Sequence, residues 1–281
     1  MNKFIRLLAC VWFVFTTTAT ASLHRIDSGC TCPELSADLY LDLVKKSLTN
    51  MIYEDAAYHG PYNAYARECG HDHPLMAHTM VGMKRLNNIQ YCMEQILQNG
   101  IPGDCIETGV WRGGCTILMR AILRVYGDKS RKVWVADSFE GLPPPNLIKY
   151  PVDKTCDLSN DSFLKVSLDQ VRANFDKYGL LDRQVIFLKG FFVDTLAQAP
   201  IESLALLRLD GDMYESTLES LESLYPKLSV GGYILIDDFG CLPTCAQAVN
   251  DYRNAHQITD PIIWVDTTGI YWQKTQVVFT N

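Results

Sequence analysis

The sequence predicts an α/β protein with a doubly wound, mostly parallel β-sheet and an N-terminal cap of helix and loop. From about residue 103 onward, short apolar strands alternate with amphipathic helices, as in a parallel sheet covered on both faces. Right-handed crossovers between such strands make the sheet doubly wound. The 281 residues are 48% hydrophobic and 20% charged, which is an ordinary globular composition with enough apolar material for a core.

Residues 1–21 have the pattern of a secretory signal peptide. Lys3 and Arg6 precede the apolar run 7–15, and residues 19–21 have the small-x-small form of a cleavage site. The run is too short for an ordinary transmembrane helix, so we expect no membrane span after processing. The pattern predicts export, either secreted or periplasmic. The alternatives are a poorly ordered apolar N-terminus and a start codon placed too far upstream. If the signal is not used, the protein is expected to be cytoplasmic.

The next segment, residues 22–78, is the predicted N-terminal cap, and residues 79–281 form the main domain. Residues 35–48 are amphipathic and predict a helix. Residues 51–78 are rich in Tyr, His, Asp and Gly with little periodicity, which predicts a loop or lid over a site. The histidines of this segment lack the spacing of a helix face, so we expect solvation or hydrogen bonding and not metal binding.

The main domain is divided by hydrophobic spacing into helices and strands. Helices are predicted at residues 79–100, 116–126 and 162–178, from Ser216 onward, and at 245–255. Strands are predicted at residues 104–108, 132–136, 184–188, 204–209, 233–236, 262–265 and 269–272. The prolines of 142–145 exclude helix and central strand, so this segment begins an irregular stretch that reaches about Asp161.

The stretch 207–240 reads as strand, helix and strand, with carboxylates at the end of each strand. Ser216 and Glu219 have the S-x-x-E spacing of a capping box, so we expect the helix to start there. Pro226 can kink the helix, and Gly231 and Gly232 are expected to end the helical region.

Asp210, Asp237 and Asp238 form a predicted metal site. Asp210 follows one strand, and the other two follow the next. The carboxyl ends of neighbouring parallel strands share an edge, where ligands bind. Three converging carboxylates repel one another unless a cation neutralises them, and oxygen ligands of this kind suit Mg²⁺ or Mn²⁺. The alternative is that all three are turn residues at strand ends.

A glycine turn follows the first strand of the main domain. Its pattern from Gly109 to Gly114, with Gly113 between, is G-x-x-x-G-G, which lacks the central glycine of a dinucleotide-binding turn. A nucleoside without phosphates, such as S-adenosylmethionine, needs only a close backbone approach and an acid for the ribose. Asp137 is the predicted ribose acid, and Glu107 is predicted to face the charged amino-acid end. Alternatively, Glu107 caps a helix and Asp137 forms a turn.

Several segments together resemble one family over about residues 76–273. They are AHTMVGMKRLNNIQ, IETGVWRGG, VADSFEGLPPP, KGFFVDTL and LRLDGDMYESTLESLESLYPKLSVGGYILIDDFG. In combination and order they resemble the macrocin O-methyltransferase family of macrolide and aminocoumarin sugar methyltransferases. The resemblance implies a class I methyltransferase fold, which is Rossmann-like, with S-adenosylmethionine as methyl donor and a divalent cation, usually Mg²⁺.

The resemblance also implies roles by position. Asp210, Asp237 and Asp238 look like the family's metal ligands, while Glu107 and Gly109 look like its cofactor turn. Asp137 and Ser138 look like its ribose and adenine side, and Thr79 and Met80 match a segment that approaches the cofactor. These are the residues that the resemblance carries over.

The sequence departs from the family at its N-terminus. Family members act inside cells, where the donor is made, so an export signal would separate this protein from it. The first 75 or so residues carry little of the resemblance, and they help to set the acceptor pocket. The sugar or other hydroxyl that is methylated therefore stays open.

The expected activity is O-methylation of a small-molecule hydroxyl, with a glycoside as the favoured acceptor. Asp210 is the candidate for both ligand and base. Asp212 is the second candidate, because residues two apart on an extended chain face the same way. The alternatives are a nicotinamide-dependent oxidoreductase and an exported, non-catalytic glycan-binding protein. The net charge of −7, without a basic cluster, argues against a nucleic-acid partner. The sequence does not indicate an oligomeric state.

Overall fold

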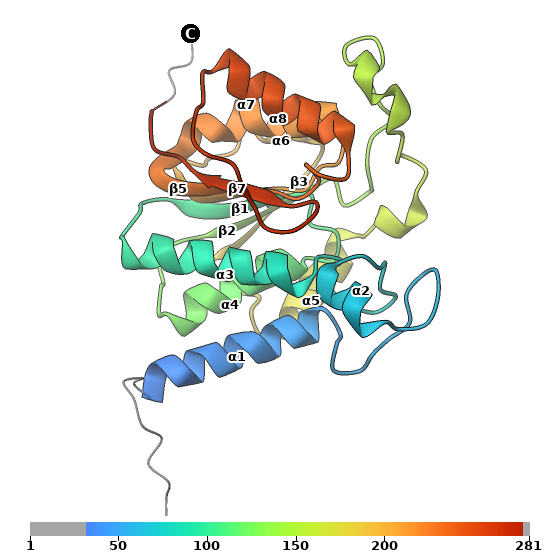
Figure 1. Cartoon of the computed structure of the whole chain (residues 1–281). Helices are drawn as coiled ribbons and strands as arrows, with labels where there is room; N and C mark the ends of the chain where they lie inside the picture. The colour runs from blue at the N-terminus through green and yellow to red at the C-terminus, as the bar shows by residue number, and fades with distance from the viewer. Residues whose placement is uncertain (1–31, 278–281) are drawn as a thin grey trace, which may run out of the picture.

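The computed structural model describes residues 32–277, so the predicted signal peptide at residues 1–21 lies outside them. A central seven-stranded sheet has the strand order β3-β2-β1-β4-β5-β7-β6 (Figure 1). Neighbouring strands are parallel except that β7 runs antiparallel to β5 and β6. The predicted fold class is confirmed. The strands are β1 (Asp104–Thr108), β2 (Val133–Asp137), β3 (Val185–Lys189), β4 (Leu204–Leu209), β5 (Leu228–Ile236), β6 (Ile263–Trp264) and β7 (Ile270–Gln273).

Helices cover both faces of the sheet (Figure 1). On one face lie α1 (Cys32–Leu48), α3 (Met83–Gln98), α4 (Gly114–Val125) and α5 (Leu168–Lys177). On the other lie α6 (Phe192–Thr195), α7 (Tyr214–Leu224) and α8 (Pro243–Ala255). Alternate strand residues face opposite layers, so Cys105 joins the α3–α4 core and Ile106 joins the α7–α8 core. The doubly wound sheet is therefore held between two separate apolar layers.

Several helices begin at other residues than the spacing predicts. α3 begins at Met83 and not at residue 79, because Gly82 is its extended N-cap. α5 begins at Leu168, where the side chain of Ser167 caps it, and residues 162–164 form a separate 3₁₀ turn. The periodicity of buried residues continues across such breaks, because an irregular turn can also bury apolar side chains.

The predicted capping box at Ser216 and Glu219 is wrong. α7 begins at Tyr214, and Ser216 is buried inside it. The N–H groups of Tyr214 and Glu215 instead donate to the carboxylate of Asp153, at 2.8 and 3.0 Å. Asp153 lies in the 3₁₀ turn η1 (Pro151–Thr155) and is fully buried. A carboxylate from a distant segment therefore caps this helix, where the helix dipole favours negative charge.

The predicted helix end at Gly231 and Gly232 is also wrong. α7 ends at Leu224 and is followed by the 3₁₀ turn η3 (Tyr225–Lys227), which contains Pro226. Both glycines lie inside β5, which is longer than expected. A Cβ at Gly232 would lie 2.7 Å from the carbonyl oxygen of Ala205, so the close approach of β4 explains this glycine.

The cap segment expected to be irregular contains the short helix α2 (Ala64–Cys69). Its Arg67 is buried and donates to the carbonyl of Thr49 at 2.7 Å. The same guanidinium pairs with Asp55 at 2.7 Å and Asp72 at 2.8 Å. A buried ion cluster thus holds this segment in place. Six residues are too few for helical periodicity to be recognised.

Within residues 32–277, no helix combines the length and the apolar character that crossing a membrane requires. Among the residues whose side chains the structure describes, the cysteines are free thiols, namely Cys69, Cys92, Cys105, Cys115, Cys156, Cys241 and Cys245.

We expect Asp153→Ala to lower the free energy of unfolding by about 1–2 kcal/mol, because α7 loses the acceptor of two N–H groups. Urea denaturation followed by circular dichroism measures this change. Asp157→Ala is the matched control, because that carboxylate lies in the same irregular segment but is exposed and only closes a turn with Ser159. Equal stability of the two variants would contradict the capping role.

Candidate active site

A cavity of about 580 Å³ opens at the carboxyl edge of the parallel strands, a size typical of small-molecule sites. Its wall comes from the cap, from the start of α3 and from the loops that follow β1 to β5. The predicted site residues that line it are Thr79, Met80, Glu107, Gly109, Asp137, Ser138, Asp210, Asp212, Asp237 and Asp238. Gly113 is not among the lining residues. The cavity therefore brings together segments far apart in the sequence.

The two glycines of the turn after β1 do different things. Gly109 has a φ of 82°, and a Cβ there would lie 1.8 Å from the carbonyl oxygen of Asp210. It therefore allows the turn to lie against the end of β4. Gly113 has a φ of 87° as the N-cap of α4, and a Cβ there would lie 2.8 Å from Val171 of α5. Gly113 thus serves the turn and its packing.

The strand register brings the acidic residues together. Leu209 of β4 pairs with Ile236 of β5, so Asp210 and Asp237 follow at neighbouring positions. One carboxylate oxygen each from Asp210, Asp237 and Asp238 can be chosen so that all lie within 4.8 Å of one another. Oxygen atoms at this spacing can bind a divalent cation.

Arg208 organises these acids, although no role was predicted for it from the sequence. The side chain is 2% exposed, and its Nη1 donates to Glu107 at 2.5 Å and to Asp210 Oδ2 at 2.7 Å. Its Nη2 donates to Asp237 Oδ1. A signal was present, because Arg208 is the one charged residue in the apolar strand 204–209. A charge in a buried strand requires partners, and the acids at neighbouring strand ends supply them.

The carboxylates of this edge outnumber the arginines that pair with them. Burial raises the pKa of Glu107 to about 8, against the opposing effect of Arg208. Burial and neighbouring carboxylates raise the pKa of Asp210 to about 6 and that of Asp212 to about 7, and they also raise the pKa of Asp238. Burial acts on Asp237 too, but Arg208 and Arg85 hold its pKa below the ordinary value. This excess of negative charge fits a bound cation.

Asp212 lines the cavity for a reason other than the expected one. Its φ is 62°, so the chain after β4 is left-handed there and not extended. Its N–H donates to Asp238 Oδ2 at 3.3 Å. The extended backbone expected at this position is therefore wrong, although Asp212 lines the cavity together with Asp210. Asp is among the residues that tolerate this conformation best.

The turn after β2 closes on Asp137. The Asp137 carboxylate accepts the N–H of Val110 at 2.8 Å and that of Phe139 at 2.7 Å. The backbone N–H of Trp111 also interacts with this carboxylate, which lines the cavity. Ser138 Oγ donates to the carbonyl of Gly141 at 2.6 Å, so this side chain holds the turn. These two residues give the cavity a fixed polar wall beside the glycine turn.

Glu107 Oε2 is a second polar atom that fits a ligand. It is buried and has no hydrogen-bond partner within residues 32–277, apart from a weak interaction of the carboxylate with the Cys115 thiol. A buried acceptor without a partner is costly, so a donor group of a bound molecule would stabilise it. The lining also includes apolar residues for which the sequence predicted no role, namely Leu142, Pro143 and Pro144 after β2, Phe191 after β3 and Phe192 at the start of α6.

Comparison with known proteins gives consistent matches. The family model for macrocin O-methyltransferases (TylF) matches residues 55–274. The chain is 54% identical over 248 residues to the 8-demethyl-8-(2,3-dimethoxy-alpha-L-rhamnosyl)-tetracenomycin-C 4'-O-methyltransferase of Streptomyces olivaceus, covering 86% of this chain and 95% of that protein. It is 48% identical over 252 residues to the mycinamicin III 3''-O-methyltransferase of Micromonospora griseorubida, covering 86% and 99%. The solved structure of the O-methyltransferase NovP superposes with a TM-score of 0.84 at 51% identity, covering 85% and 100%.

We expect the free energy of unfolding of the metal-free protein to fall as the pH rises from 6.5 to 8. Folded Asp210, Asp212 and Glu107 keep protons up to about pH 6, 7 and 8, whereas the unfolded chain has lost them near pH 4. The folded state therefore binds more protons, and raising the pH favours unfolding by about 1.4 kcal/mol per pH unit for each proton. Urea titrations in EDTA at several pH values measure the slope.

His78 does not contribute to this slope between pH 6.5 and 8. Burial lowers its pKa to about 4, so its contribution to the free energy of unfolding is lost only when the pH falls below 6.5. Asp212→Asn should flatten the slope, because one of the shifted carboxyls is removed. A stability that stays constant or rises over this window would show that the acids are compensated in another way.

Proposed function

The chain belongs to the macrocin O-methyltransferase family, and we propose that its acceptor is a sugar hydroxyl on a glycosylated small molecule. It is an S-adenosylmethionine-dependent O-methyltransferase. We further propose that Asp210, Asp237 and Asp238 hold a divalent cation, Mg²⁺ or Mn²⁺. With the family assigned, neither the oxidoreductase nor the non-catalytic glycan-binding protein is needed to account for this fold.

The acceptor class is supported by the similarity to two O-methyltransferases, which covers 86% of this chain and nearly all of each relative. The Streptomyces olivaceus protein is named for a rhamnosyl-tetracenomycin and the Micromonospora griseorubida protein for mycinamicin III. In this chain the cavity is lined both by the acidic residues at the strand ends and by apolar residues that include Pro143, Pro144 and Phe192. Such a cavity suits a molecule with hydroxyl groups at one end and apolar rings at the other.

The donor is proposed to lie along Glu107, Gly109 and Asp137. S-adenosylmethionine supplies an activated methyl group as a sulfonium. The Asp137 carboxylate lines the cavity as a hydrogen-bond acceptor and suits ribose hydroxyls, and Glu107 Oε2 suits the ammonium of the amino-acid end. Gly109 allows the donor to approach the backbone closely, and Thr79 and Met80 close the cavity from the cap side.

The acidic trio is proposed to prepare the acceptor hydroxyl. When bound, the cation supplies Lewis-acid assistance that lowers the pKa of a coordinated hydroxyl. Asp210 is the proposed proton acceptor, because Arg208 bonds only its Oδ2 and Oδ1 remains available. Asp212 is the second candidate. The rigid edge orients acceptor and donor in line, and this orientation supplies much of the rate.

We expect Asp237→Asn or Asp238→Asn to reduce methyl transfer by on the order of 100-fold or more, because the Lewis-acid contribution of several kcal/mol is lost. The assay follows labelled methyl groups from S-adenosylmethionine to a rhamnosylated polyketide, with the sugar-free polyketide as a negative control. EDTA should reduce methyl transfer by the wild type to the same extent, and added Mg²⁺ should restore the activity. The exposed Glu222→Gln on α7 should act as the wild type does.

Full activity of metal-free protein in excess EDTA would refute the proposed role of a divalent cation. Methylation of the sugar-free polyketide would refute a sugar hydroxyl as the acceptor.

We expect Asp137→Asn to weaken donor binding by about 10- to 100-fold, because a charged hydrogen-bond acceptor is lost at a cost of about 1.5–3 kcal/mol. Isothermal titration calorimetry with S-adenosylmethionine measures the affinity. Asp128→Asn is the matched control, because Asp128 also closes a turn by accepting backbone N–H groups but lies outside the cavity lining. Equal affinity of both variants would remove Asp137 from the donor site.

A further inference from the structure

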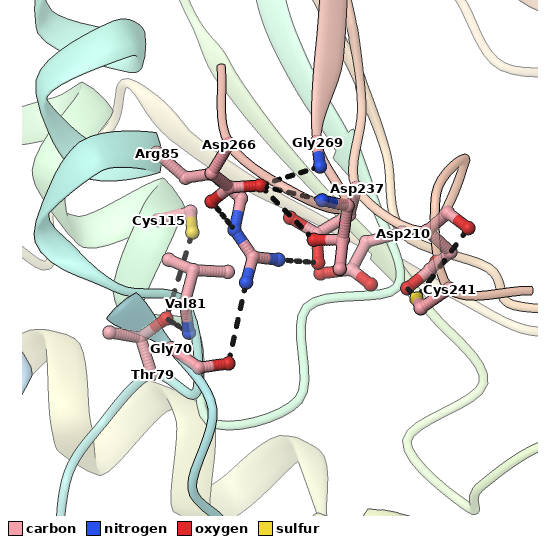
Figure 2. Close-up of polar contacts among 12 residues, drawn as sticks. Gly70, Thr79, Val81, Arg85, Cys115, Asp210, Asp237, Cys241, Asp266 and Gly269 are labelled. Carbon is pink, nitrogen blue, oxygen red and sulfur yellow. Dashed lines mark hydrogen bonds and ion pairs between the residues drawn. The ribbon is translucent and has the colours of Figure 1, made fainter. Parts of the chain in front are cut away.

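Arg85 joins four parts of the molecule at the acidic edge (Figure 2). It stands on α3, and its Nη1 donates to Asp237 Oδ2 at 2.5 Å. Its Nε lies 3.0 Å from Asp266 Oδ2, in the turn between β6 and β7. Its Nη2 lies 3.5 Å from the carbonyl oxygen of Gly70 in the cap. The side chain is 11% exposed, so these contacts are largely shielded from water.

Asp237 is held from two sides. Arg208 of β4 donates to its Oδ1, and Arg85 of α3 donates to its Oδ2. The backbone N–H of Asp237 is also fixed, because it donates to the carbonyl of Leu209 at 3.0 Å. A carboxylate oxygen can accept a second interaction, so each oxygen can still bind a cation. The paired arginines therefore set the rotamer in which Asp237 faces Asp210 and Asp238.

Arg85 is itself fixed in place. Asp266 Oδ1 accepts the N–H of Thr268 at 2.9 Å and that of Gly269 at 2.8 Å, so Asp266 presents Oδ2 to Arg85. A Cβ at Gly269 would lie 2.9 Å from Arg85 Cδ, and one at Gly70 would lie 2.8 Å from Nη2. The two glycines pack their backbones directly against the arginine and leave little room for another rotamer.

We propose that Arg85 is a positioning residue for the divalent-cation site, acting through Asp237, and that it fastens the cap to the same carboxylate. The inference rests on the proposed function, since it requires a cation at Asp210, Asp237 and Asp238. Hydrogen-bond partners of metal ligands typically contribute 10- to 100-fold to metal affinity. The positive charge of Arg85 has the opposite effect on a cation. The sign of the measured change therefore separates positioning from simple repulsion.

The test is Mn²⁺ and Mg²⁺ binding to the full chain by isothermal titration calorimetry, without turnover. Arg85→Met should bind either cation about 10- to 100-fold more weakly. Arg85→Lys should bind nearly as weakly, because one ammonium cannot bridge Asp237, Asp266 and Gly70. Asp266→Asn should weaken binding less, because it keeps an oxygen for the turn and loses the charge that faces Arg85. The donor KM should stay unchanged while the Mg²⁺ activation constant rises.

Arg120→Met is the matched control. Arg120 is also a buried arginine, paired with Asp182 at 2.5 Å, but it lies outside the cavity lining. This variant should lose stability in urea and keep the wild-type cation affinity. Hydrogen exchange of residues 64–72 should increase in Arg85→Met and not in Arg120→Met, because only the first releases the cap.

Unchanged or tighter cation binding by Arg85→Met, with wild-type binding intact, would overturn the positioning role. If Arg85→Met does not fold, Arg85→Lys and Asp266→Asn decide by the same criterion. A wild type that binds neither cation would refute the proposed metal site, and the positioning role with it. The two outcomes are distinguishable, because cation binding is lost by the wild type in the first case, whereas the wild type still binds the cation if only the role of Arg85 is wrong.

Discussion

The buried guanidinium of Arg208 is the interaction on which the rest of the site depends. A charge in the centre of a parallel sheet is tolerated only when it is fully paired. Here the register places Glu107 opposite Arg208, and the strand ends add Asp210 and Asp237. The arginine thus draws carboxylates from three adjacent strands to one edge. Without the positive charge of Arg208, these buried carboxylates would repel one another.

The acids still outnumber the arginines around them, and burial together with this excess raises the pKa of Asp210 and Asp212. The raised pKa values of Asp210, Asp212 and Glu107 mean that ionising these carboxyls costs free energy unless a positive charge compensates for it. The same groups face a cavity suited to a charged donor and a hydroxylated acceptor. Perturbed pKa values of this kind are common at active sites. Surrounding glycines, above all Gly109, keep the backbone close enough for the edge to stay compact.

Charged side chains also attach the cap to this edge. Arg67 holds the cap together through Asp55 and Asp72, and Arg85 connects it to Asp237. The cap residues Gly70 to His73 then form part of the cavity wall. Polar contacts of this kind require specific partners and directions, whereas apolar packing tolerates many arrangements. The position of the cap over the site is therefore defined by a few arginines.

The sequence by itself determined the fold class, the strands β1 and β4 and the convergence of Asp210, Asp237 and Asp238. These follow from local rules, namely hydrophobic spacing and the common edge of parallel strand ends. The tertiary structure alone decided which residues pair across long separations. Asp153 caps α7 from 61 residues away, Arg85 reaches Asp237 across 152 residues, and Arg208 meets Glu107 across 101. Such contacts depend on how elements pack against one another, and no local pattern specifies that packing.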